Sequence, residues 1–277
     1  MSHLFALRQY AEFCGSKAEW PPYLSGEDGY VRLTLALAKG IILTTQAIKA
    51  EQPDAVTVQV EALYHTFTKD SSLRDQADHY NARQYLCFEL STGRVNDDYV
   101  LADFLCSHAV TDAELEWFRR NAVTFDFFGA NFYPWSYGEL RKEPNGSIRY
   151  VSGEISGDKI DIVLREVYKR YQIPIMITET SANKTISHRA RWMDATIDTV
   201  RQLRVEGIPV IGYTWFPLFT MIKWDYRKGR RPLKDYLIHL GLYDAAFDSE
   251  GILRRRKTPL VKRYQRHIAN PMPPIGN

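Results

Sequence analysis

Four short segments of the chain are rich in apolar residues, and longer stretches with apolar positions at helical spacing separate them. Three of the four are nearly continuous apolar runs, which is typical of strands buried on both faces in a parallel sheet. The predicted strands are 55–62 (AVTVQVEA), 125–133 (FDFFGANFY), 173–180 (IPIMITET) and 209–215 (PVIGYTW).

Helical patterns fill much of the remaining chain. Thr111 or Asp112 is a suitable N-cap for the third helix, Asp158 for the fourth, and Gly207 is a suitable C-cap for the fifth. The predicted helices are 29–49, 74–90, 112–121, 158–170, 188–206 and 258–268. Strands that alternate with helices indicate βα units and a parallel sheet.

Other segments are predicted to lack regular structure. We expect long loops at 91–110, 134–157 and 220–249. The basic run 254–257 (RRRK) is interpreted as the solvated start of the last helix. The proline-rich end indicates a flexible tail over 270–277.

The number of strands limits the fold class. A closed (β/α)8 barrel needs eight strands in about 250 residues, and four strands are identified here. The sequence therefore predicts an α/β fold of the (β/α)8 TIM-barrel type that is partial, with about four C-terminal βα units. We expect a single domain over residues 1–277, and a truncated barrel.

Composition excludes some functional classes. The 277 residues carry 36 basic and 33 acidic side chains, a net charge of +3, which is too mild to indicate nucleic-acid binding. Cys14, Cys87 and Cys106 lack metal-site spacing and fit a reducing compartment. No signal-peptide layout and no apolar run of about 18 residues is evident, so we expect a cytoplasmic protein without membrane contact. His65 with Asp70 lacks a third ligand, and no metal or cofactor is expected.

Candidate catalytic residues follow the third and second strands, because parallel α/β folds carry their chemistry at the carboxyl ends of strands. Glu179 comes directly after a buried run, where a rigid carboxylate is suited to attack an anomeric carbon. A Glu there can equally cap the next helix or pair with an Arg. Asn131 and Tyr133 share one face of the second strand. The Tyr133 hydroxyl can donate to a neighbouring carboxylate, or Tyr133 can be a core residue.

Aromatic residues follow the fourth strand. Trp215 and Phe216 end it, and Trp224 lies further on. Tryptophan faces stack on the apolar faces of sugar rings, although buried core tryptophans are equally common. Both a sugar-binding role and a core role are therefore open for these residues.

Several of these motifs resemble family 1 glycoside hydrolases, the β-glucosidase family. The motifs are ITETS at 177–181, GANFYP at 129–134 and GYTWFPLF at 212–219, and the resemblance extends from about residue 13 to 260. It implies a (β/α)8 barrel that hydrolyses β-glycosides with retention of configuration, using two glutamates. Glu179 would match the nucleophile, Tyr133 the residue that orients it, and Asn131 its neighbour. Trp224 would match the sugar platform, whose other Trp falls at Phe216.

The sequence departs from the family pattern in one motif, one residue and one segment. The acid/base Asn-Glu-Pro motif is not found in residues 1–10 (MSHLFALRQY). Glu61 at the end of the first strand, and less so Glu12, are candidate substitutes. Lys223 replaces a sugar-binding Glu, which favours an anionic substrate or marks a surface charge. The first four strands of the family barrel also have no counterpart.

The predicted function is that of a glycosidase on a small-molecule sugar substrate, impaired if no acid is present. The alternative is a catalytically silent carbohydrate-binding or scaffold fragment. Open strand edges are sites of association, so we also expect homo-oligomers, pairing with another chain, or low stability.

Overall fold

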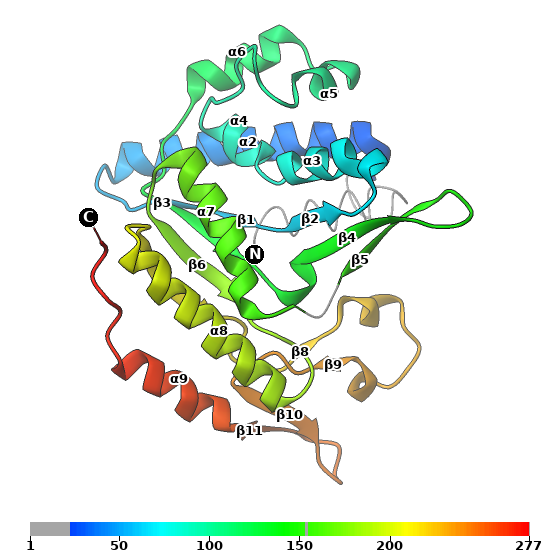
Figure 1. Ribbon diagram of the computed structural model, residues 1–277, viewed down its shortest axis with the longest axis vertical. Coiled ribbons are helices and arrows are strands. Elements are labelled where there is room, and N and C mark those ends of the chain that lie inside the picture. The colour runs from blue at the N-terminus through cyan, green and yellow to red at the C-terminus, as the bar shows by residue number, and fades with distance from the viewer. Residues whose placement is uncertain (1–22, 153–154, 277) are drawn as a thin grey trace. The chain divides into compact units, whose positions relative to one another are not determined.

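A computed structural model describes residues 23–152 and 155–276 (Figure 1). The chain forms two compact units, Met1–Gly129 with Gly138–Val151 and Ala130–Tyr137 with Ser152–Asn277. Whether they behave as the single expected domain stays a prediction. The α-helices are α2 (Gly26–Glu51), α3 (Arg74–Arg83), α4 (Leu86–Ser91), α5 (Ala102–Ser107), α6 (Asp112–Asn121), α7 (Ile160–Tyr171), α8 (Ile186–Val205) and α9 (Pro259–Ala269). The strands are β1 (Val58–Ala62), β2 (His65–Thr68), β3 (Phe127–Asn131), β4 (Tyr137–Lys142), β5 (Ile148–Ser152), β6 (Ile175–Thr180), β7 (Val210–Trp215), β8 (Met221–Ile222), β9 (Leu237–Ile238), β10 (Tyr243–Phe247) and β11 (Leu253–Lys257).

The long helix α2 supplies one side of the core of the first unit. Its buried residues include Val31, Leu35, Ala38 and Ile42, which recur at helical spacing and pack in one cluster with residues of α4, α5 and α6. An 18-residue window of α2 has a mean hydropathy of 1.3, so by length and composition this helix could cross a membrane. This corrects the expectation that no segment would qualify. A helix that packs into a protein core passes the same test, and α2 does pack there.

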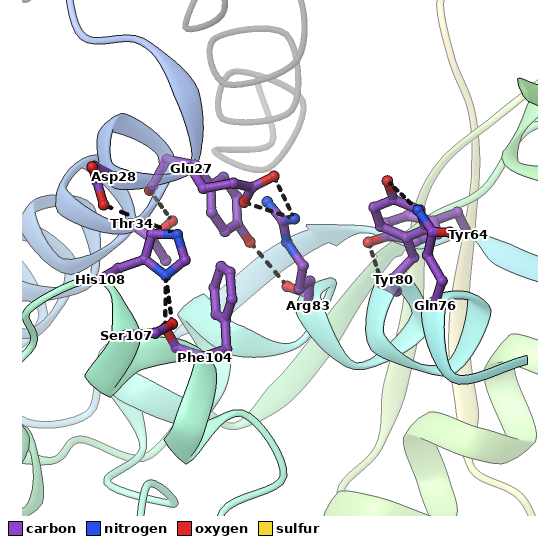
Figure 2. A network of polar contacts seen from close by, with 11 residues as sticks. Glu27, Asp28, Thr34, Tyr64, Gln76, Tyr80, Arg83, Phe104, Ser107 and His108 are labelled. Carbon is purple, nitrogen blue, oxygen red and sulfur yellow. Dashed lines mark hydrogen bonds and ion pairs between the residues drawn. The ribbon is translucent and has the colours of Figure 1, made fainter. Parts of the chain in front are cut away.

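A buried arginine joins the start of α2 to α3. The Arg83 guanidinium pairs with Glu27 (Nη1 to Oε2, 2.9 Å) and lies over the rings of Tyr30 (4.0 Å) and Phe104 (5.2 Å). Figure 2 shows this network, in which His108 approaches Asp28 at 4.0 Å. Two aromatic faces and one carboxylate replace the water that the buried guanidinium loses.

The first unit also holds a sheet that the sequence did not predict. Strands β4 and β5 form a hairpin beside β2, in the order β2-β4-β5, within the segment expected to be a loop. In the same unit β1 lies next to β3, and Gly129 makes this approach possible. A Cβ at Gly129 would lie 2.8 Å from Val60 Cγ2.

The second unit contains the parallel sheet that the apolar runs predict. The end of β3 lies next to β6, and β6 pairs in parallel with β7. Helix α8 packs on β7 and lies beside α7 and α9. The predicted helix 188–206 corresponds to α8, and Gly207 follows it with φ +88°. Its left-handed backbone fits the predicted helix end.

Some local predictions were wrong. The basic run 254–257 belongs to strand β11, which pairs antiparallel with β10, and is not a helix start. The 220–249 segment contains β8, β9 and β10. Asp158 lies in a short 3-10 turn, and α7 begins after Lys159. The predicted helix 74–90 is divided into α3 and α4.

The ends of the chain are described in part. Cys87 is buried and Cys106 is exposed, both as free thiols, whereas Cys14 and Glu12 lie outside the described residues. In the expected tail, the Pro273 carbonyl accepts from Arg204 Nε at 2.7 Å, and Gly276 N donates to the Arg204 carbonyl at 2.7 Å. Flexibility of residues 270–277 stays a prediction.

Candidate active site

The carboxyl ends of β3 and β6 bring a tyrosine and a glutamate together. The Tyr133 hydroxyl donates to Glu179 Oε2 at 2.8 Å. Phe132 N also donates to the Glu179 carbonyl oxygen at 3.0 Å, so backbone pairing continues past the end of β3. Both side chains are half-buried. The fixed backbones therefore hold the carboxylate in one orientation without removing it from the surface.

The electrostatics keep Tyr133 a hydrogen-bond donor. Burial raises the pKa of the Tyr133 hydroxyl far above its ordinary value, and the negative charge of Glu179 raises the pKa further. The hydroxyl thus remains protonated throughout the neutral and mildly alkaline range. A carboxylate that accepts a hydrogen bond from such a donor is restricted in its orientation.

A second polar contact lies just before the first, one residue earlier on β6 and two residues earlier on β3. Thr178 Oγ1 is 2.7 Å from Asn131 Oδ1, and Asn131 is 2% exposed. Sequence reasoning singled out Asn131 but missed Thr178. Alternate residues of a strand share one face, so Thr178 lies on the same face of β6 as Thr180. A polar partner for Asn131 could therefore have been sought at position 178.

A third contact anchors this edge to the helix layer. Thr180 Oγ1 donates to the Phe132 carbonyl at 2.7 Å and accepts from Trp192 Nε1 of α8 at 3.0 Å. Thr180 is completely buried. The residue after the carboxylate is therefore fixed from two sides.

The aromatic residues at the end of β7 differ in their surroundings. Trp215 is 5% exposed and its indole donates to the Leu240 carbonyl at 3.0 Å, which are the surroundings of a core residue. Phe216 is 38% exposed and precedes a cis peptide bond to Pro217. Of the two, Phe216 has the face available to a ligand.

Lys223 and Trp224 lie in the loop after β8. Lys223 is exposed, its backbone N donates to the Tyr236 carbonyl at 2.8 Å, and its ammonium pairs with no carboxylate among the described residues. The Trp224 side chain lies outside the described structure. Sugar contact by either residue stays a prediction.

Glu61, the candidate acid, belongs to the first unit. It is 0% exposed, and its Oε1 accepts from Gln59 Nε2 at 2.6 Å. The two side chains lie on one face of β1, which the 59/61 spacing dictates. An acid catalyst must reach the leaving oxygen, and a fully buried Glu61 would have to become accessible first.

Among the residues that the structure describes, no three His, Cys, Asp or Glu side chains gather as they would around a metal ion. The expectation that no cofactor is needed stays a prediction. The site as described therefore consists of a half-buried carboxylate, its tyrosine donor and exposed aromatic rings.

A parallel sheet with helices packed against it, and polar residues at the carboxyl ends of its strands, is typical of α/β folds, the TIM-barrel type among them. The predicted fold class, a partial (β/α) barrel, is confirmed by the solved structures that match this chain. No family model matches the sequence, and no curated protein matches it either.

Solved structures do match. A family 1 β-glucosidase from Thermotoga maritima superposes with a TM-score of 0.76 at 15% identity, covering 95% of this chain and 61% of that one. The T. maritima β-glucosidase in complex with castanospermine gives 0.75 at 16% identity, with 95% and 62% covered. The cyclophellitol complex also gives 0.75 at 16%, with 93% and 60% covered. The chain spans about three fifths of these relatives, and the likeness shows the fold.

Proposed function

We propose that this chain cleaves β-glycosides with retention of configuration, using Glu179 as the nucleophile. The observation that supports this most is the 2.8 Å bond from the Tyr133 hydroxyl to Glu179 Oε2 at the carboxyl edge of the sheet. The similar structures are β-glucosidases, and the motifs around both residues resemble that family. The nucleophile role is an inference from this combination.

The proposed reaction has two steps. Glu179 Oε2 is held by Tyr133, so Oε1 attacks the anomeric carbon. The bond from this carbon to the leaving oxygen breaks, and its electron pair goes to that oxygen. Water then attacks the same carbon from the opposite side and releases a proton to solvent, while the bond of the glycosyl ester breaks and its electron pair regenerates the Glu179 carboxylate. Two inversions give net retention.

Protonation of the leaving oxygen is the step for which Glu61 is the candidate acid. Glu61 is buried and bound to Gln59. General acid catalysis contributes about 10²–10⁴-fold. Aryl glycosides with acidic phenols should therefore react, because p-nitrophenolate leaves without a proton, whereas alkyl glycosides should react slowly.

The burial of Glu61 also favours a second candidate function. If no acid reaches the site, the exposed Phe216 ring and the fixed Glu179 carboxylate still provide an apolar surface and an acceptor for sugar hydroxyls. The chain would then bind β-glycosides without turning over unactivated ones.

Hydrolysis of p-nitrophenyl β-glucoside separates these functions, with Glu179→Gln as the test and Glu206→Gln as the matched control. Glu206 lies in the same unit and pairs with Arg165. We expect Glu179→Gln to abolish release of p-nitrophenolate and Glu206→Gln to leave it within two-fold of wild type. A 2-deoxy-2-fluoro-β-glucoside with a dinitrophenyl leaving group should label Glu179 covalently, as read by peptide mass spectrometry.

The opposite results are equally clear. Binding of a β-glucoside without turnover or labelling would support the sugar-binding alternative. Turnover that survives in Glu179→Gln, or a label on another residue, would refute the assignment of the nucleophile.

A further inference from the structure

The turn after β3 places a tryptophan at the surface beside the candidate site. It is a short 3-10 turn, Pro134–Ser136, whose first and last residues are buried while Trp135 is 38% exposed. Ser136 N donates to the Tyr133 carbonyl at 2.9 Å, and a proline at the first position fixes the backbone. The exposed ring is therefore held by a rigid turn.

The indole of Trp135 stacks on the phenol ring of Tyr133. The ring centroids are 4.7 Å apart and the planes differ by 8°. The hydroxyl of that same phenol ring donates to Glu179 at 2.8 Å. The three side chains thus form a series in which Trp135 covers one face of the residue that holds the carboxylate.

We infer that Trp135 is a positioning residue, which keeps the Tyr133 hydroxyl on Glu179 by covering the face of the phenol ring. Its catalytic consequence depends on the proposed function. A phenol ring rotates about χ2 in a broad well, so a parallel neighbour restricts that rotation. The indole also excludes water from the ring, which preserves the desolvated surroundings of the hydroxyl.

The expected size of the effect follows from the strength of aromatic pairs. Loss of one such pair corresponds to about a 2- to 10-fold change in rate. Since Trp135 acts through Tyr133, the change should fall on kcat and leave KM unaltered. A ring that binds substrate would change KM.

A double-mutant cycle tests this inference. We expect Trp135→Ala to lower kcat on p-nitrophenyl β-glucoside about 2- to 10-fold, and Trp135→Phe, which keeps a stacking ring, to stay within two-fold of wild type. In a Tyr133→Phe background, Trp135→Ala should cause no further loss, because the hydroxyl it positions is gone. A rise in KM in both backgrounds, or equal losses in both, would overturn the inference.

A second measurement does not need turnover. In protein labelled with [13Cζ]tyrosine, the Tyr133 resonance is assigned by its loss in Tyr133→Phe. This resonance should keep its protonated position to pH 11 in wild type and titrate at lower pH in Trp135→Ala. An unchanged resonance in Trp135→Ala, with Glu179 labelled normally, would refute the role of Trp135 alone. The Tyr133 resonance can instead titrate at lower pH in Trp135→Ala while the wild type shows neither turnover nor labelling of Glu179. That result would refute the proposed function alone.

Discussion

Removing the Tyr133 hydroxyl is the smallest change that reaches the candidate nucleophile. Tyr133→Phe deletes one oxygen and keeps the ring that stacks on Trp135. In the wild type this oxygen donates to Glu179 Oε2 at 2.8 Å, and burial with the charge of Glu179 keeps its pKa high, so it is an O–H donor wherever the protein is folded. The variant therefore removes a permanent donor and leaves the packing in place.

The magnitude follows from the kind of bond that is lost. A hydrogen bond to a charged group contributes about 1.5–3 kcal/mol, and each 1.36 kcal/mol is a factor of ten in rate. Because attack by Glu179 neutralises its charge, part of the bond strength is also lost in the transition state. What remains is the orientation of the carboxylate, so we expect kcat/KM to fall about 10- to 100-fold.

The assay is the initial rate of p-nitrophenolate release, with Tyr213→Phe as the control. Tyr213 is also a tyrosine of the second unit, and its hydroxyl is 2.8 Å from Thr196 Oγ1 of α8, so its loss should change stability without changing kcat/KM. The alkaline limb of the pH profile should not move in Tyr133→Phe, because Tyr133 does not ionise there. Activity of Tyr133→Phe within two-fold of wild type, or a displaced alkaline limb, would refute the reasoning.

Two further predictions concern stability. Burial raises the pKa of Tyr30, Tyr133, Tyr213 and Tyr264 above the usual value of 10. Above pH 10 the unfolded chain loses these protons while the folded chain keeps them. The free energy of unfolding should therefore fall as pH rises, by up to about 1.4 kcal/mol per pH unit for each such group. A melting temperature that stays constant from pH 9 to 11 would contradict this prediction. Arg83→Met should lower the free energy of unfolding in urea by about 1–3 kcal/mol, because it removes the ion pair with Glu27 and two cation–π contacts. Glu27→Gln, on a carboxyl that is 53% exposed, should cost less than about 1 kcal/mol; equal losses in both variants would show that the ion pair, rather than the aromatic contacts, dominates.

The sequence predicted the central elements because burial on both faces leaves a strong signal. The runs around β6 and β7 identified both strands to within two residues, and of the two predicted N-caps for α6, Thr111 and Asp112, the structure has Thr111. Strands β4 and β5 were missed because β5 (IRYVS) buries none of its residues fully and so leaves no apolar pattern of a buried strand. Such a strand depends on cross-strand pairs that local composition does not show. Strand β11 carries three arginines and was missed for the same reason.

The candidate site was predictable where it follows the strand-end rule. Glu179 and Tyr133 lie at the carboxyl ends of neighbouring parallel strands, and the structure brings them together. Trp135 was not predictable, because it sits in a turn whose geometry depends on the buried Pro134 and Ser136 rather than on a periodic pattern. The burial of the Glu61 carboxylate beside Gln59 was not predictable either, because the sequence shows only that Glu61 follows an apolar run.

The predicted association through open strand edges concerns β7, which is an edge strand of its sheet among the described residues. The Val210 carbonyl accepts from Arg204 Nη1 at 2.6 Å, and the Tyr213 carbonyl accepts from the Tyr264 hydroxyl at 3.1 Å. A strand added at this edge would compete with both side chains for these acceptors. Edge strands of monomeric proteins are protected by charged side chains and covering helices in this way, and α8 and α9 supply both here. Pairing of a second copy at β7 would therefore have to break two hydrogen bonds before it forms its own, and this lowers the net gain from strand addition.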